Sequence, residues 1–287
     1  MSKNWDKVTA EMNLISLPDV YWRLKEILPS RDYSIRDIGQ IIMYDPGLTV
    51  RLLRIVNSAY FGFSSKIETV NHALSILGVR QIEELILTTS VANTFGSYEC
   101  EQLDMSQFWR GSVYRAITAR ELAGVCNLMD GERMFVAGLL SGIGHLVMYQ
   151  SIPQLAHQAK QQAEQTGESL YQVEREVIGF DHVQVAARLM ENWKLPDSLI
   201  GMIKNHLQVD TNASYLLETS IAHIAAIFGN AYVASEPLKQ ALSAVDSYAW
   251  GRTGLNIKRC EASNAVVEQQ LGSVVNLMFP NLKGKAI

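Results

Sequence analysis

Apolar residues recur at helical spacing along almost the whole chain, and this pattern limits the fold more than any other feature of the sequence. Side chains three or four positions apart share one face of a helix. Two clear runs of this kind are Leu48, Leu52 and Val56, and Phe135, Leu139 and Ile143. Strict alternation of apolar and polar residues, which marks a half-buried strand, persists nowhere. The sequence therefore predicts an all-α fold without a sheet.

Residues typical of helix ends fall where this periodicity starts and stops. Asp45 can cap a helix whose first turn contains Pro46, and Thr69 can cap another. Gly78 suits the end of the helix that follows Thr69, because glycine adopts the backbone conformation of a C-cap easily. We expect a further helix from about Ile82 onward.

A polar stretch at residues 97–106 separates two groups of predicted helices. We expect an N-terminal helical lobe over residues 1–97 and a second helical lobe over residues 98–212. Residues 213–287 should form C-terminal helices that complete or cap the second lobe. No pair of helices recurs at a fixed period, so a solenoid is not indicated.

Charge and cysteine content narrow the class of protein. The formal net charge of -4 gives no general attraction to nucleic acid or anionic membranes. The apolar runs fall short of the roughly 18 to 20 residues that span a bilayer, and residues 1–14 lack a signal-peptide core. Cys100, Cys126 and Cys260 are too far apart for a disulfide framework or a paired zinc spacing. We expect a cytoplasmic protein with no membrane insertion and no nucleic-acid partner.

An ordered series of short motifs resembles the HDOD domain family. The series lies within about residues 14–208. It consists of IIMYDPGL at 41–48, LLRIVNSA at 52–59, Ala73-Leu74 with Leu77-Gly78, Phe108-Trp109, AGLL at 137–140 with Ile143-Gly144, Glu174 followed by GFDH at 179–182, and WKLP at 193–196. Many motifs in the right order make coincidence improbable.

The resemblance implies an N-terminal helical bundle packed on a lobe related to the HD superfamily of metal-dependent phosphohydrolases. It also implies a role in bacterial signal transduction. HDOD domains are regarded as regulatory or output modules, and no common reaction is established for them. The expected partners are therefore other signalling proteins.

The resemblance also places the positions where HD enzymes carry their metal ligands. Such a site uses imidazole and carboxylate ligands, including an adjacent His-Asp pair, to hold hard cations that activate water. The pair would fall on Ser141-Gly142, an upstream histidine on Gly111, and a final aspartate on the helix at 221–228. Neither Gly111 nor Ser141-Gly142 supplies an imidazole or a carboxylate, and residues 211–245 contain no aspartate. We expect no metal, no other cofactor and no catalysis.

Four polar residues remain as candidates for a residual pocket: His145, Asp181, His182 and His206. His182 and His206 make a poor metal cage, and hydrogen bonding explains them better. Ser141 lies four residues before His145, a spacing that can place a nucleophile and a base on one helix face. No orienting third group or nucleophile-elbow sequence accompanies the pair, so a Ser-His hydrolase is disfavoured.

Three glycines and three arginines have simpler interpretations. Gly138, Gly142 and Gly144 indicate close helix packing, since no strand precedes them as in a phosphate-binding loop. The arginines recur every five residues, which turns them around a helix and favours a solvated face over a basic stripe. They are Arg110, Arg115 and Arg120.

Three aromatic residues gather in the loop after the helix at 46–56: Tyr60, Phe61 and Phe63. They form either a patch for a protein partner or a plug in the core, and the plug is favoured.

The sequence thus favours a non-catalytic signalling module that acts through protein–protein interaction. The alternative is a divergent phosphohydrolase acting on a nucleotide or cyclic dinucleotide with the residual site.

Overall fold

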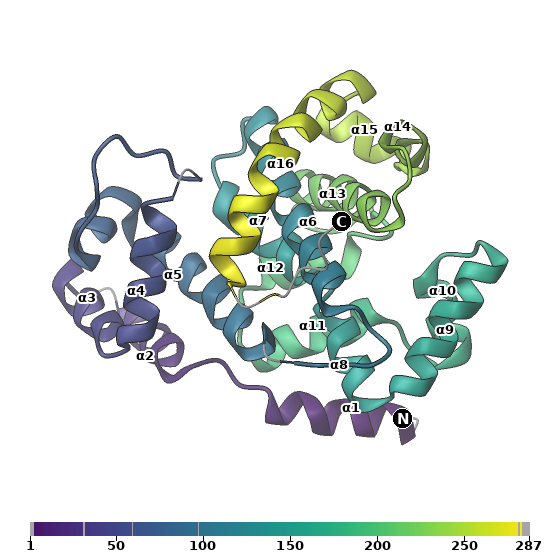
Figure 1. The fold of residues 1–287 in the computed structure, drawn as a ribbon, viewed down its shortest axis with the longest axis horizontal. Coiled ribbons are helices and arrows are strands. Elements are labelled where there is room, and N and C mark those ends of the chain that lie inside the picture. Colours follow the sequence, from purple (N-terminus) through teal and green to yellow (C-terminus); the bar gives the residue numbers. More distant parts are fainter. Residues whose placement is uncertain (1–2, 31, 59, 97, 281, 283–287) are drawn as a thin grey trace. The chain divides into compact units, whose positions relative to one another are not determined.

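Every secondary-structure element in the described part of the chain is a helix, which confirms the all-α prediction (Figure 1). The computed structural model describes residues 3–30, 32–58, 60–96, 98–280 and 282. Chain contacts define two compact units. Unit 1 contains Met1–Ile15 and Glu99–Glu268, and unit 2 contains Ser16–Tyr98 and Gln269–Ile287. Each end of the chain therefore groups with helices that are distant in sequence.

Unit 1 holds most of the helices. They are α1 (Lys3–Leu14), α6 (Met105–Val125), α7 (Gly131–Leu140), α8 (Ile143–Ser151), α9 (Pro153–Thr166), α10 (Leu170–Val177), α11 (His182–Asn192), α12 (Asp197–Asn205), α13 (Leu216–Ala234), α14 (Leu238–Ala241), the 3-10 turn Leu242–Ala244 and α15 (Ser247–Thr253). The long helix α16 (Ile257–Met278) has residues in both units.

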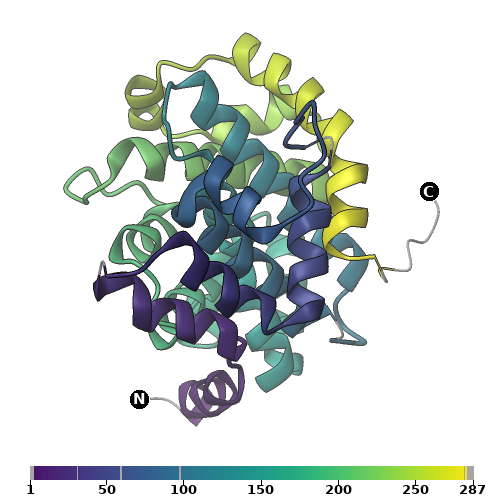
Figure 2. The same ribbon diagram turned by 90° about the vertical axis from the view of Figure 1, so that its left-hand side faces the viewer.

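Unit 2 is smaller and uses the remaining helices. They are α2 (Asp19–Ile27), a 3-10 turn (Leu28–Ser30), α3 (Ile35–Met43), α4 (Pro46–Val56) and α5 (Val70–Gly96), drawn in purple and blue in Figure 2. Helices α2, α3 and α4 pack against α5. Gly78 interrupts α5 with a φ of 81°, a backbone conformation that glycine adopts without strain.

The expected helix caps are present in unit 2. The Asp45 side chain accepts a hydrogen bond from the backbone N–H of Leu48 at 2.9 Å, with Pro46 in the first turn. The Thr69 hydroxyl accepts one from the backbone N–H of His72 at 3.1 Å. Ala59, the last residue of the 52–59 motif, lies outside the described residues.

The core of unit 1 is built around α6, which is buried along most of its length between α7 and α13. Helix α8 packs against α11, and α9 and α10 form an antiparallel pair (Figure 1). Gly138 and Gly144 confirm the close-packing prediction. A Cβ on Gly138 would lie 2.6 Å from Ala116 Cα, and one on Gly144 would lie 1.9 Å from the carbonyl oxygen of His182.

Two apolar stretches of unit 1 reach the length and hydropathy of a membrane span: Gly131–Ser151 and Leu216–Ala234. The expectation that no apolar run approaches this length was therefore wrong. In the structure 83% and 61% of these windows are buried, and the first is interrupted by the turn between α7 and α8. Both stretches behave as core helices, which bury apolar residues on every side.

Candidate functional site

A cavity of about 590 Å³ opens among helices α6, α8, α9, α10 and α13 of unit 1. Its lining includes three of the four polar candidates from the sequence, His145, His182 and His206. Glu174 and Arg115, which were not among the predicted site residues, also line it. The cavity therefore coincides with the region where an HD-type site is expected.

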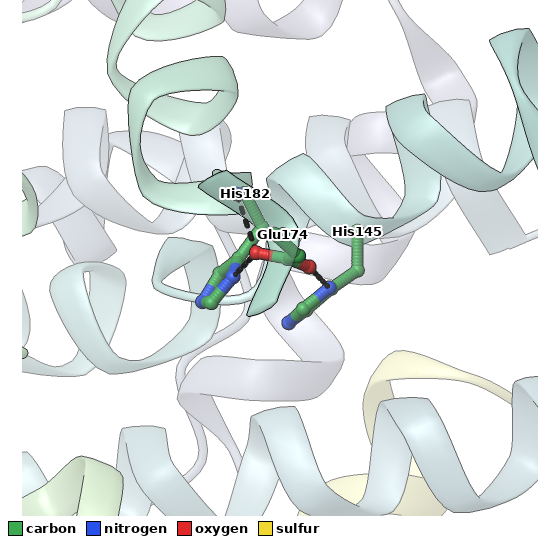
Figure 3. Close-up of side chains that lie close together, drawn as sticks. All are labelled: His145, Glu174 and His182. Carbon is green, nitrogen blue, oxygen red and sulfur yellow. Dashed lines mark hydrogen bonds and ion pairs between the residues drawn. The ribbon is translucent and has the colours of Figure 1, made fainter. Parts of the chain in front are cut away.

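Glu174 joins two of these histidines into one group, in which Glu174 and His182 are buried and His145 is partly exposed (Figure 3). One carboxylate oxygen accepts hydrogen bonds from the backbone N–H of His182 at 2.9 Å and from His182 Nδ1 at 2.6 Å. The other oxygen lies 3.4 Å from His145 Nδ1. The two imidazoles stack with their centroids 3.8 Å apart. This group could also hold a metal ion, because one ligand atom from each residue lies within 4.8 Å of the others.

The pKa values in this group follow from burial and from the short contacts. Burial alone would raise the pKa of Glu174, but the electrostatic interaction with His182 and the hydrogen bonds from His145 and His182 lower it below its ordinary value. Burial and the neighbouring His182 lower the pKa of His145 to about 4. Glu174 is therefore ionised and His145 neutral at pH 7, with the proton of His145 on Nδ1 facing the carboxylate.

Arg115 corrects the interpretation of the arginines as a solvated face. Its side chain leaves α6 toward the cavity, and burial lowers its pKa to about 10. Nη2 donates to the hydroxyl of Ser112 at 3.0 Å, while Nε is buried with no hydrogen-bond partner. No carboxylate lies within ion-pair distance of Arg115 in the described part of the chain. The five-residue spacing of the arginines gave the wrong expectation, because other helices cover α6 on nearly all sides.

Two glycines provide the space that Arg115 occupies. A Cβ on Gly142 would lie 2.6 Å from Arg115 Nη2, and one on Gly229 of α13 would lie 2.1 Å from Arg115 Cγ. Gly142 is the position where the resemblance places the aspartate of the His-Asp pair. The guanidinium thus lies in the space that an aspartate side chain at this position would enter.

Two further histidines that line the cavity, His206 and His223, are fixed by backbone groups. His206 Nδ1 lies 2.7 Å from the carbonyl oxygen of Ile203 and must carry the proton in order to donate to it. Burial lowers the pKa of His206 to about 3. His223 uses both nitrogens, because Nδ1 donates to the His206 carbonyl and Nε2 accepts from the Asp246 N–H. His223 therefore has a structural role, whereas His206 keeps Nε2 available.

Three other predicted positions lie outside this polar group or play packing roles. Gly111 is buried in α6 beneath Val233 and does not line the cavity. Asp181 caps α11 through the backbone N–H of Gln184, forms an ion pair with Arg175, and does not line the cavity. Ser141 lies in the turn before α8, where its hydroxyl donates to the Gly138 carbonyl instead of His145.

The aromatic loop in unit 2 does not plug the core. Tyr60 and Phe61 are partly exposed and Phe63 is exposed. The rings cover one another, since Tyr60 packs edge-on against Phe61 and Phe61 stacks on Phe63. Asn57 closes the loop by exchanging two hydrogen bonds of 2.7 Å with the backbone of Ile67. The expectation of a core plug was therefore wrong.

Comparison with known protein families decides the relationship. The profile of the HDOD domain matches residues 14–209, more than half of the chain. The chain belongs to the HDOD domain family. Its HDOD domain thus includes Arg115, Glu174 and the histidines of the cavity except His223.

Solved structures share the fold of this HDOD protein. An HDOD domain protein from Geobacter sulfurreducens matches with a TM-score of 0.69 and 18% identity, covering 96% of this chain and 97% of that protein. A Shewanella amazonensis protein whose name proposes a phosphohydrolase matches with a TM-score of 0.70 and 20% identity, covering 97% and 98%. A Marinobacter aquaeolei protein whose name proposes signal transduction matches with a TM-score of 0.69 and 17% identity, covering 96% and 65%. At these identities the likeness shows the fold alone.

One curated protein also matches this chain. It is an uncharacterized protein of Treponema pallidum, 22% identical over 191 residues. The match spans 66% of this chain but only 37% of that protein.

Proposed function

We propose that this HDOD protein is a non-catalytic signal-transduction or output module that acts through contacts with other signalling proteins. The observation that carries the proposal is the pairing of Gly142 with Arg115. Where an HD enzyme carries an aspartate for its metal, this chain has no side chain, and a guanidinium enters the space. A fixed positive charge there opposes a divalent cation.

The remaining donors fit the divalent centre of an HD enzyme poorly. Both oxygens of Glu174 already face the Nδ1 atoms of His145 and His182. Two imidazoles and one engaged carboxylate leave a hard cation short of the oxygen ligands it prefers. These donors therefore do not support a metal-dependent catalytic step.

The alternative is a divergent metal-dependent phosphohydrolase acting on a nucleotide or cyclic dinucleotide. It is favoured by the spacing of His145, Glu174 and His182, whose ligand atoms lie within 4.8 Å of one another. A carboxylate behind an imidazole is also the usual arrangement around a metal-bound histidine.

Phosphodiester hydrolysis separates these two functions. We expect no manganese-dependent hydrolysis of bis(4-nitrophenyl) phosphate by the wild-type protein. The double variant Ser141→His with Gly142→Asp should also stay inactive, because the upstream histidine is still replaced by Gly111. Its added bulk should lower stability by about 1 to 3 kcal/mol. Metal-dependent turnover by the wild type would establish the alternative.

The aromatic loop is the proposed surface for a partner. Replacing Phe61 and Phe63 together with serine should reduce capture of a signalling protein from the native cytoplasm. Ile76→Ser is a matched control, because Ile76 is an exposed apolar residue of the same unit outside the loop. Equal capture by both variants would remove this loop from the proposal.

A further inference from the structure

Arg115 is a cation that is largely enclosed by the protein, and the described part of the chain provides no anion for it. A buried charge without a counter-charge destabilises the folded protein, and native proteins seldom keep one without a reason. Here the fold accommodates the charge through two glycines, Gly142 and Gly229, whose Cβ atoms would collide with it. Burial lowers its pKa only to about 10, so Arg115 stays positively charged at neutral pH.

The other charged groups that line the cavity already have partners. Glu174 is bound by His145 and His182, and Glu164 lies 3.9 Å from Lys160 one helical turn earlier. Asp104 caps α6 by accepting from the backbone N–H of Gln107 at 3.0 Å. Among the charged lining residues that the structure describes, Arg115 alone lacks an ionic or capping partner.

The imidazoles indicate a second property that a molecule bound in this cavity would need. The Nδ1 atoms of His145, His182 and His206 face protein acceptors. In the neutral tautomer that these contacts select for His145 and His206, Nε2 is a hydrogen-bond acceptor. Neither Nε2 atom has a partner among the described residues. A molecule that fills the cavity can therefore donate hydrogen bonds to them from hydroxyl or amino groups.

The size of the cavity and the start of α8 point to the same class of ligand. A volume of about 590 Å³ lies within the range of sites for nucleotide-sized molecules, roughly 300 to 1,000 Å³. Helix α8 begins after Gly142, so the positive end of its dipole lies beside the guanidinium. A guanidinium together with a helix N-terminus suits the several oxygens of a phosphate group.

We propose that this cavity binds a small phosphate-bearing molecule, with Arg115 holding the phosphate and the imidazoles of His145 and His206 accepting from its hydroxyl or amino groups. The inference rests on the proposed function, because it assigns the same cavity to ligand binding without turnover. Arg115 then supplies the positive charge that a metal supplies in an HD enzyme.

Calorimetric titration of the full chain tests the proposal with three probes at matched ionic strength: adenosine monophosphate, inorganic phosphate and acetate. The nucleotide should bind most tightly, because it has both the phosphate and hydrogen-bond donors. Inorganic phosphate should bind more weakly, and acetate least. Arg115→Gln should weaken binding of the nucleotide at least about tenfold, because it removes the charge and the fork of donors.

Two further variants test the proposal if Arg115→Gln folds poorly. Gly142→Asp gives Arg115 an internal carboxylate, so it should also weaken nucleotide binding at least about tenfold. Arg110→Gln is the matched control on the same helix and should bind as the wild type does, because Arg110 contacts Tyr232 and does not line the cavity.

Three results would overturn the inference: no binding of either phosphate probe, binding that persists in Arg115→Gln, or acetate binding as tight as that of phosphate. Conversion of the nucleotide to adenosine is a separate outcome. It would contradict the non-catalytic function while supporting a phosphate site.

Discussion

The two sides of the cavity differ in how their charges are balanced. On one side, Glu174 binds His145 and His182, and every strong contact is made within the protein. On the other side, Arg115 has only the hydroxyl of Ser112 as a hydrogen-bond partner among the described residues. The first side stabilises the fold, whereas the second retains a charge that the fold alone does not need.

This difference separates structural polar groups from those available to a ligand. Burial by itself does not make the distinction, since Glu174 and His206 are both almost fully buried. The distinction depends instead on whether each polar atom already has a partner within the protein. The substitutions below should therefore cost stability on the Glu174 side and ligand binding on the Arg115 side.

Removal of the Glu174 carboxylate should have the largest effect on stability. Glu174→Ala leaves three hydrogen-bond donors in the core without an acceptor and should lower the free energy of unfolding by about 3 to 5 kcal/mol. Glu191→Ala is the control, because Glu191 forms surface ion pairs with Arg188 and Lys204 and should cost less than about 1 kcal/mol. Urea titrations of both variants measure this. Equal losses would mean that the Glu174 group does not stabilise the fold.

The two glycines that flank Ile143 should respond differently to alanine. Gly144→Ala places a Cβ 1.9 Å from a backbone carbonyl oxygen and should cost about 3 kcal/mol. In Gly142→Ala the only close contact of the new Cβ is with the flexible end of Arg115, since the Phe108 ring lies at an ordinary 3.6 Å, so the substitution should cost about 1 kcal/mol or less. Gly201→Ala, with open space around it, should stabilise α12 by about 0.5 kcal/mol. Thermal midpoints rank the three, and the reverse order for Gly144 and Gly142 would contradict the packing described.

Acid should weaken the protein through His206. Its pKa is lowered in the folded state to about 3, so the unfolded chain takes up the proton first as the pH falls below about 6.5. Stability should therefore decrease from pH 6.5 downward, by about 2 kcal/mol from this residue at pH 5. His206→Gln should reduce the difference in unfolding free energy between pH 7 and pH 5. If the variant and the wild type showed the same difference in unfolding free energy, His206 would take up its proton as readily in the folded protein as in the unfolded chain.

Removal of Arg115 should have little effect on stability. Arg115→Gln keeps the Cγ that packs on Gly229 and eliminates an uncompensated buried charge, so the free energy of unfolding should change by about 1 kcal/mol or less. Chemical denaturation without added ligand measures this. A loss comparable to that of Glu174→Ala would mean that Arg115 is as structural as the carboxylate.

Much of the fold was predictable because local rules and packing agree. Asp45 and Thr69 cap helices as expected, since capping depends only on residues a few positions away, and Gly78 leaves the helical conformation inside α5. Glycines at 138 and 144 also signalled close helix contacts correctly. The predicted boundaries of the lobes stay a prediction. No local signal in the sequence tells with which helices the N-terminal and C-terminal segments pack.

The candidate site was predictable only in part. The sequence named His145, His182 and His206 as candidates for a polar pocket, but it gave no role to Glu174, although Glu174 belongs to one of the motifs. Its distance of eight residues from His182 gives no hint that the start of α11 points at its carboxylate. Arg115 was misinterpreted because charge spacing on one helix cannot reveal that α7 and α13 cover it. Such contacts between distant segments are set by tertiary packing.

Manganese binding tests the central claim most directly, namely that Arg115 takes the place of a metal in this cavity. The account predicts no stoichiometric binding to the wild type by calorimetry. Arg115→Gln should gain weak binding, because the repulsion beside His145, Glu174 and His182 is removed. Binding of about one ion per wild-type chain with micromolar affinity, unchanged in Arg115→Gln, would contradict it.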